Sequence, residues 1–149
     1  MTDIQRTTAE NKDFRKLVVL LDQFLAELDG EDHAFYAQFD KLDNIKNAVV
    51  CYEGNKVAGC GAFKKFDTDT VEIKRMFVHP DFRGKGIASA VLKELELWAS
   101  ENNYSCCVLE TGTNNPKAIA LYQKSGYEII PNFGQYENVE TSVCLKKQL

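Results

Sequence analysis

The stretch Val71–Ala99 decides the fold and reads VEIKRMFVHPDFRGKGIASAVLKELELWA. Residues 70–78 are rich in β-branched and aromatic side chains and predict a strand, which ends at His79-Pro80 because proline has no N–H for the ladder. From residue 87 onward apolar side chains recur at helical spacing and predict a helix. The turn Arg83-Gly84-Lys85-Gly86 therefore joins a strand to the start of a helix.

This turn predicts a phosphate site. The first turn of a helix has N–H groups without an internal partner, and its dipole favours an anion. Gly84 and Gly86 let the backbone come close to a phosphate, while Arg83 and Lys85 add positive charge. The alternative is that the two glycines only make a tight turn. A nucleotide-binding P-loop is excluded because the pattern GxxxxGK[ST] is absent.

The neighbouring elements indicate the topology. Residues 48–52, 56–66 and 70–78 read as β-runs separated by short turns, which predicts an antiparallel meander. Residues 105–110 form another β-run after the helix, and strand–helix–strand predicts a right-handed parallel crossover. A dinucleotide-binding domain needs its fingerprint after the first strand of repeated βαβ units, so the near match to GxGxxG at residues 84–89 is rejected on context.

The rest of the chain completes one mixed sheet. The remaining expected elements are a strand at 4–8, helices at 12–29, 32–41 and 116–125, and strands at 127–130 and 141–147. Gly30 marks the end of the first helix, while Asn115 and Gly126 cap the last. We expect a single domain over residues 1–149 of α/β (α+β) class, with an antiparallel N-terminal half, a parallel central pair and about four helices.

Composition excludes several functions. The chain has 149 residues and a net charge of −4 without a local basic run, which disfavours a nucleic-acid partner. No apolar run reaches the roughly 18 residues of a membrane span, and no basic segment precedes an apolar core at the start, so we expect no membrane and a cytoplasmic location. The five cysteines form no CxxC pair and read as reduced core thiols. His33 and His79 lack metal-ligand spacing, so no metal is expected.

Two motifs carry a resemblance to a known family. Residues 83–88 match the signature [RQ]-x-x-G-x-[GA], and residues 71–99 resemble the central motif of the GNAT superfamily of N-acetyltransferases nearly end to end. LETGTNNPKAIALYQKSGYEII, residues 109–130, resembles the motif that follows, with Asn115 and Tyr122 in the usual places. The resemblance covers roughly residues 48–149 and implies the acyl-CoA N-acyltransferase fold with acetyl-CoA as cosubstrate.

The resemblance also implies where the cosubstrate binds. The pyrophosphate would be held by the backbone amides of Arg83, Gly84, Lys85, Gly86, Ile87 and Ala88. Main-chain groups of Met76, Phe77 and Val78 would pair with the pantetheine arm, as an added strand pairs with a sheet edge. The parallel strands would splay apart to admit that arm. Asn115 would contact the cosubstrate, and its competing role is the helix cap.

Transfer to an amine needs a base, a polarised carbonyl and a proton for the departing thiolate. The resemblance implies Tyr122 as the acid beside the CoA sulfur, the alternative being packing alone. The resemblance also makes Glu72 the candidate base through water, because superfamily members often place a glutamate near the start of this strand. The alternative is a surface carboxylate paired with Lys74 or a cross-strand lysine. Glu110 is the rival base, and a water relay stays open.

Other side chains are weighed for the acceptor. A period of two places Glu72, Lys74 and Met76 on one face and directs Lys74 and Arg75 to opposite faces. Because a charge inside a sheet is costly unless paired or wet, at least one of these cations is expected to meet CoA or an anionic part of the acceptor. Four further residues are candidates for contact with the acceptor, each with a structural role as the alternative: Tyr136, Asp32, His33 and Tyr36.

The resulting prediction is direct acetyl transfer, in a ternary complex, to a small-molecule or peptide amine. The motifs offer no cysteine–histidine pair for a covalent intermediate. The alternative is a non-catalytic acyl-CoA-binding sensor or scaffold. The sequence does not indicate which amine is the acceptor, and a homodimer that pairs through sheet edges stays open.

Overall fold

The computed structural model describes residues 2–32 and 45–149. The strands are β1 (Thr2–Thr7), β2 (Asn47–Glu53), β3 (Lys56–Lys65), β4 (Thr70–Val78), β5 (Cys106–Gly112), β6 (Glu128–Ile130) and β7 (Ser142–Gln148). The α-helices are α1 (Lys12–Asp29), α3 (Ile87–Glu101) and α4 (Pro116–Lys124). Short 3₁₀ turns follow at η1 (Gly30–Asp32), η2 (Pro80–Phe82) and η3 (Gly134–Tyr136).

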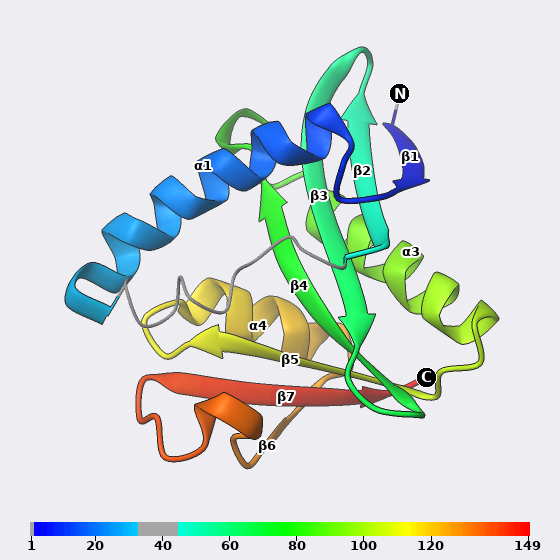
Figure 1. The fold of residues 1–149 in the computed structure, drawn as a ribbon. Helices are drawn as coiled ribbons and strands as arrows, with labels where there is room; N and C mark the ends of the chain where they lie inside the picture. Colours follow the sequence, from blue (N-terminus) through cyan, green and yellow to red (C-terminus); the bar gives the residue numbers. More distant parts are fainter. Residues whose placement is uncertain (1, 33–44) are drawn as a thin grey trace.

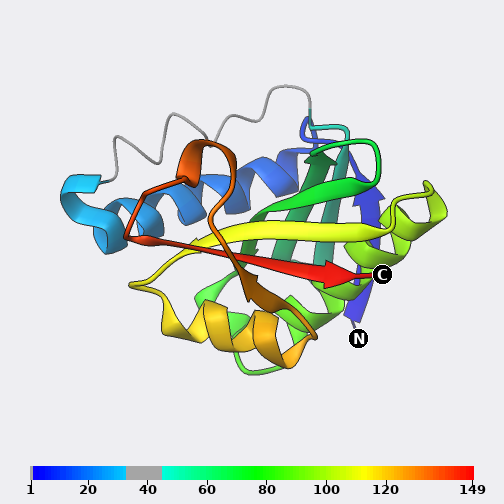
Figure 2. The same ribbon diagram turned by 90° about the horizontal axis from the view of Figure 1, so that it is seen from below.

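The strands form one seven-stranded sheet in the order β1-β2-β3-β4-β5-β7-β6. Only β4 and β5 pair in parallel among these described strands, and every other neighbouring pair is antiparallel. The predicted mixed sheet with an antiparallel first half and a parallel central pair is therefore confirmed. Figure 2 shows β5 beside β7, with the short β6 at the outer edge of this half.

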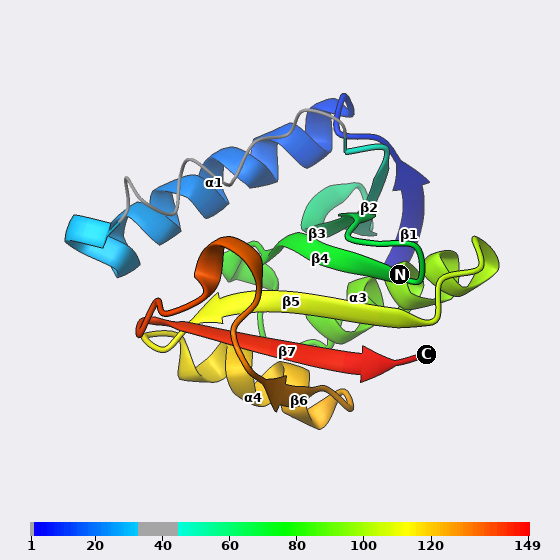
Figure 3. The ribbon, with the colours of Figure 1, turned by 60° about the horizontal axis from the view of Figure 1, so that its bottom comes forward.

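The helices cover both faces of the sheet. Figure 3 shows α1 on one side of the sheet and α3 and α4 on the other. Each side has its own core: Phe14, Leu17 and Leu21 of α1 pack on the first face, and Leu92 and Leu95 of α3 pack on the second. Burial of these apolar stripes, which the helical spacing predicted, holds the two layers to the sheet.

The residues described contain three α-helices rather than about four. The further helix expected at 32–41 lies outside the described residues except for Asp32, which belongs to η1. Of the predicted helix-end residues, Asn115 caps α4 with its side chain and Gly30 follows α1 with a φ of 55°. The C-cap of α4 is Ser125, and the predicted Gly126 follows it with a φ of 101°. Asn11, which was not predicted, caps α1 with its side chain. No helix in the described part of the chain combines the length and apolar character that crossing a bilayer requires.

The parallel pairing between β4 and β5 is short, and the two strands separate beyond it. Its register covers only Thr70↔Cys106, Val71↔Cys107 and Glu72↔Val108. Beyond Glu72 the two strands diverge, as Figure 1 shows where β4 runs toward α1 and β5 runs toward α4. The predicted splay of the parallel strands is therefore confirmed.

A bulge in β4 corrects the predicted alternation of side chains. Cys60 pairs with Phe77 and Ala62 pairs with Lys74, so Gly61 alone faces two residues of β4, Arg75 and Met76. Arg75 has a φ of 60°, which is rare for a residue with a Cβ. This extra residue shifts the period of two by one position.

The faces of β4 are accordingly different from the prediction. Ile73, Met76 and Val78 lie on the face covered by α3, where Ile73 belongs to the core and the other two pack against it. Lys74 pairs with Ala62 of the α1-side core, and Arg75 reaches Asp22 on α1, so both cations lie on the α1 face. The prediction that Lys74 and Arg75 point to opposite faces was wrong, as was the grouping of Met76 with Glu72 and Lys74.

The bulge requires a residue without a side chain opposite it. A Cβ on Gly61 would lie 2.5 Å from the Met76 sulfur and 2.9 Å from methyl carbons of Val91 and Leu95. We expect Gly61→Ala to lower the free energy of unfolding by about 1–3 kcal/mol, the usual cost of an overpacked core. Urea unfolding followed by the fluorescence of Trp98 measures this loss. An unchanged midpoint at an unchanged denaturant slope would show that the core opposite the bulge has spare room.

Candidate active site

A cavity of about 490 Å³ lies where β4 and β5 diverge and extends to the start of α3 and the end of α1. Of the twelve residues predicted to bind the cosubstrate or to act as the leading acid and base, eleven line it: Glu72, Met76, Phe77, Val78, Arg83, Gly84, Gly86, Ile87, Ala88, Asn115 and Tyr122. Lys85 is the predicted cosubstrate-binding residue that does not line it. The structure thus gathers two sequence motifs and both candidate catalytic residues around one space.

The first turn of α3 forms one end of this cavity. Gly84 and Gly86 have φ values of 79° and 78°, a left-handed conformation that only glycine adopts readily. A Cβ at either position would meet no atom within 4 Å, so the space over both glycines is open. Gly86 is the N-cap of α3 and makes no side-chain capping bond, whereas asparagines cap α1 and α4. The amides of this turn are therefore available to an anion.

The two cations of the turn have different positions. The Nε of Arg83 donates to the Val78 carbonyl at 3.1 Å, and its guanidinium lies over the rings of Phe77 and Phe24 at 5.5 and 5.7 Å. Lys85 instead lies over the ring of Phe82, with its Nζ 5.5 Å from the ring centroid. Arg83 is thus positioned at the cavity wall, whereas Lys85 can contribute charge only from outside it.

The second half of β4 offers a free edge toward the cavity. Phe77 and Val78 pair with Cys60 and Gly59 of β3 on one side, and the register with β5 on the other side has already ended at Glu72. The main-chain groups on that second edge face the cavity that Met76, Phe77 and Val78 line. An extended ligand arm can add to this edge as an extra strand, except that the Val78 carbonyl already accepts from Arg83.

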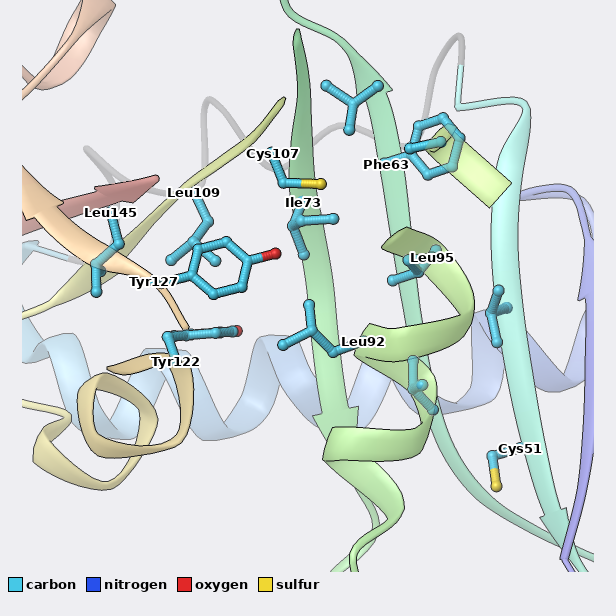
Figure 4. Close-up of a cluster of buried hydrophobic side chains, with 14 of the residues drawn as sticks. Cys51, Phe63, Ile73, Leu92, Leu95, Cys107, Leu109, Tyr122, Tyr127 and Leu145 are labelled. Carbon is cyan, nitrogen blue, oxygen red and sulfur yellow. The ribbon is translucent and has the colours of Figure 1, made fainter. Parts of the chain in front are cut away.

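Tyr122 enters the cavity from the side of α3 and α4. Its side chain is 7% exposed, and its ring packs edge-on against Tyr127 at a centroid distance of 5.8 Å. Figure 4 shows the two rings together, close to Leu109 of β5. Burial, and secondarily the charge of Glu110, raises the pKa of the Tyr122 phenol well above its ordinary value. The phenol therefore keeps its proton at neutral pH and can act as a donor.

Tyr127 is itself fixed by a buried network that sequence reasoning missed. Its hydroxyl donates to Glu96 on α3 at 2.8 Å, and Glu96 also accepts from Lys147 on β7 at 2.9 Å. The backbone amide of Tyr127 donates to the carbonyl of Tyr122. This network holds the end of α4 against α3 and β7, which fixes the position of the Tyr122 ring.

Glu72 lies on the opposite face of the sheet from Tyr122 and is buried, with 4% exposure. One of its carboxylate oxygens is 4.0 Å from the Nζ of Lys74, a contact too long for a direct hydrogen bond. The alternative prediction that Glu72 is a surface carboxylate was therefore wrong, because the side chain is buried. The ion pair with Lys74 that this alternative included is present. The carboxylate is thus placed where it could exchange a proton with an acceptor through a water molecule.

Glu110 also lines the cavity and is half-buried. It occupies the end of β5, opposite Cys144 in the register with β7, and accepts a hydrogen bond from the Ser142 hydroxyl at 2.8 Å. The hydroxyl fixes the carboxylate at the cavity wall. Both candidate bases therefore reach the same cavity from the α1 face, and the geometry of the described residues leaves both in place.

Arg75 lies next to Lys74 in this wall. Its side chain is 2% exposed and forms an ion pair with Asp22 of α1, whose side chain is 53% exposed. Its left-handed backbone costs on the order of 1–3 kcal/mol, and such strain concentrates at functional sites. The bulge therefore places a second buried cation beside Lys74, which a regular strand could not do.

The other predicted residues lie as follows. The Asn115 side chain accepts from the Ala118 amide at 3.3 Å, so its role as a helix cap is confirmed, and it also lines the cavity. Tyr136 is buried in η3 and lines the cavity as well. Asp32 is exposed in η1 and does not line the cavity. His33 and Tyr36 lie outside the described residues.

Sequence reasoning missed the contribution of α1. The first half of its apolar face is core, but Phe24, Leu25 and Leu28 continue the stripe into the cavity wall. The Asn114 side chain donates to the Leu28 carbonyl at 3.0 Å and to Asp29 at 3.2 Å, which ties the end of α1 to the loop before α4. The sequence did contain a signal for this contribution. The apolar stripe of α1 continues to Leu28, which is longer than packing on the sheet alone requires.

The five thiols and His79 do not line the cavity. All five cysteines are buried and free, and none lines the cavity. Burial raises the pKa of the Cys60 and Cys107 thiols to about 12. His79 accepts from the Asp81 amide and caps η2. Within residues 2–32 and 45–149, no three His, Cys, Asp or Glu side chains gather as a metal site.

Comparison with known proteins identifies the fold and the class. Residues 13–127 match the model of the Acetyltransferase (GNAT) family. The IAA acetyltransferase of Azospirillum brasilense is 34% identical over 138 residues, which cover 90% of this chain and 89% of that protein. The N-acetyltransferase YsnE of Bacillus subtilis is 35% identical over 100 residues, 66% of either chain.

Solved structures agree with these relatives. An acyl-CoA N-acyltransferase from Klebsiella pneumoniae superposes with a TM-score of 0.84 at 25% identity, covering 100% of this chain and 98% of that one. A GNAT family acetyltransferase from Elizabethkingia anophelis, solved with acetyl-CoA bound, superposes with a TM-score of 0.71 at 24% identity, covering 99% and 98%.

Proposed function

This chain belongs to the GNAT family of acetyltransferases, and we propose that acetyl-CoA binds with its diphosphate at the first turn of α3 and its thioester between β4 and β5. As a member of the family the chain is an N-acetyltransferase, which moves an acetyl group to an amine acceptor. The observation that carries the binding mode is the uncapped N-terminus of α3 at one end of the cavity. The similar Elizabethkingia structure was solved with acetyl-CoA bound, which supports acetyl-CoA as the cosubstrate.

The residues proposed for cosubstrate binding follow from this placement. Backbone amides between Arg83 and Ala88 hold the diphosphate, and Arg83 adds charge at the wall. The free edge of Met76–Val78 pairs with the pantetheine arm, except at the Val78 carbonyl that Arg83 occupies. Asn115 borders the same space while it caps α4. Acetyl-CoA supplies the reactive thioester, and the protein supplies its orientation.

The chemistry requires proton transfers on two sides of the reacting carbonyl. Tyr122 reaches the cavity from the α4 side with its proton retained, so we assign it the donation to the departing thiolate sulfur. Glu72 and Glu110 reach the cavity from the other face, where the amine must lose a proton as its C–N bond forms. The opening between β4 and β5 thus lets acid and base act from opposite faces of one sheet.

We propose direct transfer in a ternary complex. A covalent acetyl-enzyme would need an activated nucleophile, but no cysteine lines the cavity, and the thiols of Cys60 and Cys107 have raised pKa values. The acceptor is a small-molecule or peptide amine. Residues 1–149 act as one N-acetyltransferase domain in this proposal, with a cytoplasmic location and either a monomer or a homodimer as the assembly.

The base is assigned by comparing two matched variants. We expect Glu72→Gln to lower turnover by roughly a hundredfold and Glu110→Gln to lower it several-fold, because Glu72 is the more buried carboxylate and lies beside the Lys74 ammonium. Turnover is measured by release of the CoA thiol at saturating substrates across a range of pH. The reverse order of effects assigns the base role to Glu110, and small effects in both variants assign it to a water relay.

The rival function is a non-catalytic acyl-CoA sensor. Purified protein is titrated calorimetrically with acetyl-CoA and is then tested for thiol release with a broad panel of amines. Binding followed by amine-dependent thiol release supports the enzyme. Binding without release from any amine supports the sensor, and absence of binding removes the proposed cosubstrate site.

A further inference from the structure

Two adjacent buried cations line the cavity on the face of the sheet that α1 covers, and removing their charges from water is energetically unfavourable. Lys74 and Arg75 have side chains only 7% and 2% exposed, and both line the cavity. Taking a charge out of water is unfavourable unless partners compensate it. Carboxylates near this pair include Glu72 of β4, which is 4.0 Å from Lys74, and Asp22 of α1, which pairs with Arg75. Glu110 of β5 and Asp29 of α1 line the same cavity.

The β4 bulge, which has a strained backbone, places the Arg75 side chain beside Lys74. Arg75 occupies the left-handed position of the β4 bulge, with a φ of 60°, where glycine or asparagine would fit with less strain. Because of the bulge, Arg75 points to the same face as Lys74. There it pairs with Asp22 of α1, whose side chain is 53% exposed.

We propose that Lys74 and Arg75 bind a carboxylate of the acceptor, so that the substrates of this enzyme are small amines that also carry a carboxylate. This inference rests on the proposed function, because it concerns the acceptor end of the same cavity. The planar guanidinium of Arg75 matches a carboxylate with two parallel hydrogen bonds, and the Lys74 ammonium adds a point charge beside it.

The remaining wall is consistent with an acceptor of mixed charge. Glu72 and Glu110 lie on the same face as the two cations and face the ammonium of an incoming amine before its deprotonation. With Asp29 they make three carboxylates around the cavity, so an acceptor that carries an ammonium beside its carboxylate matches the mixed charge of this lining. The cavity of about 490 Å³ also has to hold the acyl end of the cosubstrate, so the acceptor is small.

The test uses matched acceptors that differ in one carboxylate. Glycine is compared with glycinamide, β-alanine with β-alaninamide, and 4-aminobutyrate with 4-aminobutanamide, and putrescine and O-phosphoethanolamine complete the panel. Thiol release gives kcat and KM for each. We expect the carboxylate member of at least one pair to exceed its amide by roughly tenfold or more in kcat/KM, which corresponds to about 1.4 kcal/mol.

Variants then connect the preference to the wall. Arg75→Met should raise KM for the carboxylate acceptor by roughly tenfold and leave the amide acceptor nearly unchanged, and Arg75→Lys should restore part of the difference. Arg75 is the better position for this test, because removal of Lys74 would leave the buried Glu72 without that neighbouring charge. Lys93→Met, an exposed change on α3 outside the cavity, is the control.

The outcomes separate this inference from the proposed function. Equal rates for carboxylates, amides and putrescine, or a preference for O-phosphoethanolamine, would overturn the carboxylate assignment while leaving acetyl transfer intact. A fall in Arg75→Met that is equal for both members of a pair would show a structural role and also overturn it. If no amine releases thiol although acetyl-CoA still raises the melting temperature, the proposed function fails, and this inference fails with it.

Discussion

Replacement of Tyr122 by phenylalanine should lower turnover by roughly a hundredfold and leave the dissociation constant of acetyl-CoA nearly unchanged. The ring keeps its packing against Tyr127, so the cavity wall retains its shape. Only the proton donor is lost. The departing thiolate must then take its proton from water, which is not held in position.

The pH dependence of this step follows from the shifted pKa. Burial first, and Glu110 second, raise the pKa of Tyr122 above its ordinary value of 10.0. The phenol therefore stays protonated throughout the neutral and mildly alkaline range, and a limb of the pH–rate profile in that range belongs to another group. Above the ordinary value the unfolded chain loses this proton before the folded one does, so the contribution of Tyr122 to stability falls as the pH rises.

Two measurements check the assignment of Tyr122. Thiol release at saturating substrates gives turnover, and calorimetric titration gives acetyl-CoA affinity. Tyr104→Phe is the matched control, because Tyr104 is half-buried against Phe63 and does not line the cavity. Unchanged turnover in Tyr122→Phe would remove the phenol from the mechanism, and loss of acetyl-CoA binding would make it a binding residue.

The predictable parts of this molecule are those that local chemistry specifies. The strand–turn–helix at residues 70–99 follows from β-branched residues, two glycines and a helical stripe, and the structure has each element there. Asn115 and Pro116 similarly begin α4 as their backbone preferences require. The same local signals predicted the turn at residues 83–88, most of which lines one end of the cavity, without any knowledge of the sheet.

The β4 bulge was not predictable in the same way. It depends on Gly61 in the neighbouring strand, on the room that Met76 takes against Val91 and Leu95, and on the partner that α1 offers to Arg75. None of these contacts is adjacent in sequence. A regular period of two therefore gave the wrong face for Met76 and the wrong separation of Lys74 and Arg75. The wall that we propose to select the acceptor is thus the part of the site that only the tertiary structure reveals.

The second large effect is expected on acetyl-CoA affinity, from a change in the glycine turn at the start of α3. Gly86→Val should weaken acetyl-CoA binding by roughly ten- to a hundredfold, which is about 1.4–2.8 kcal/mol. A β-branched residue is strained at the φ of 78°, and its side chain would enter the open space over the turn, where the diphosphate is proposed to lie. Both effects disturb the amides at the first turn of α3.

A matched glycine separates strain from lost binding. Gly54 has a φ of 64°, and a Cβ there also meets no atom within 4 Å, but it lies in the β2–β3 turn and does not line the cavity. Gly54→Val should therefore show a similar loss of melting temperature and an unchanged calorimetric affinity for acetyl-CoA. Equal affinities in the two variants would mean that the diphosphate does not lie over Gly86. Because the thioester is positioned relative to that anchor, the roles of Tyr122 and Glu72 would then have to be assigned again from a different pose.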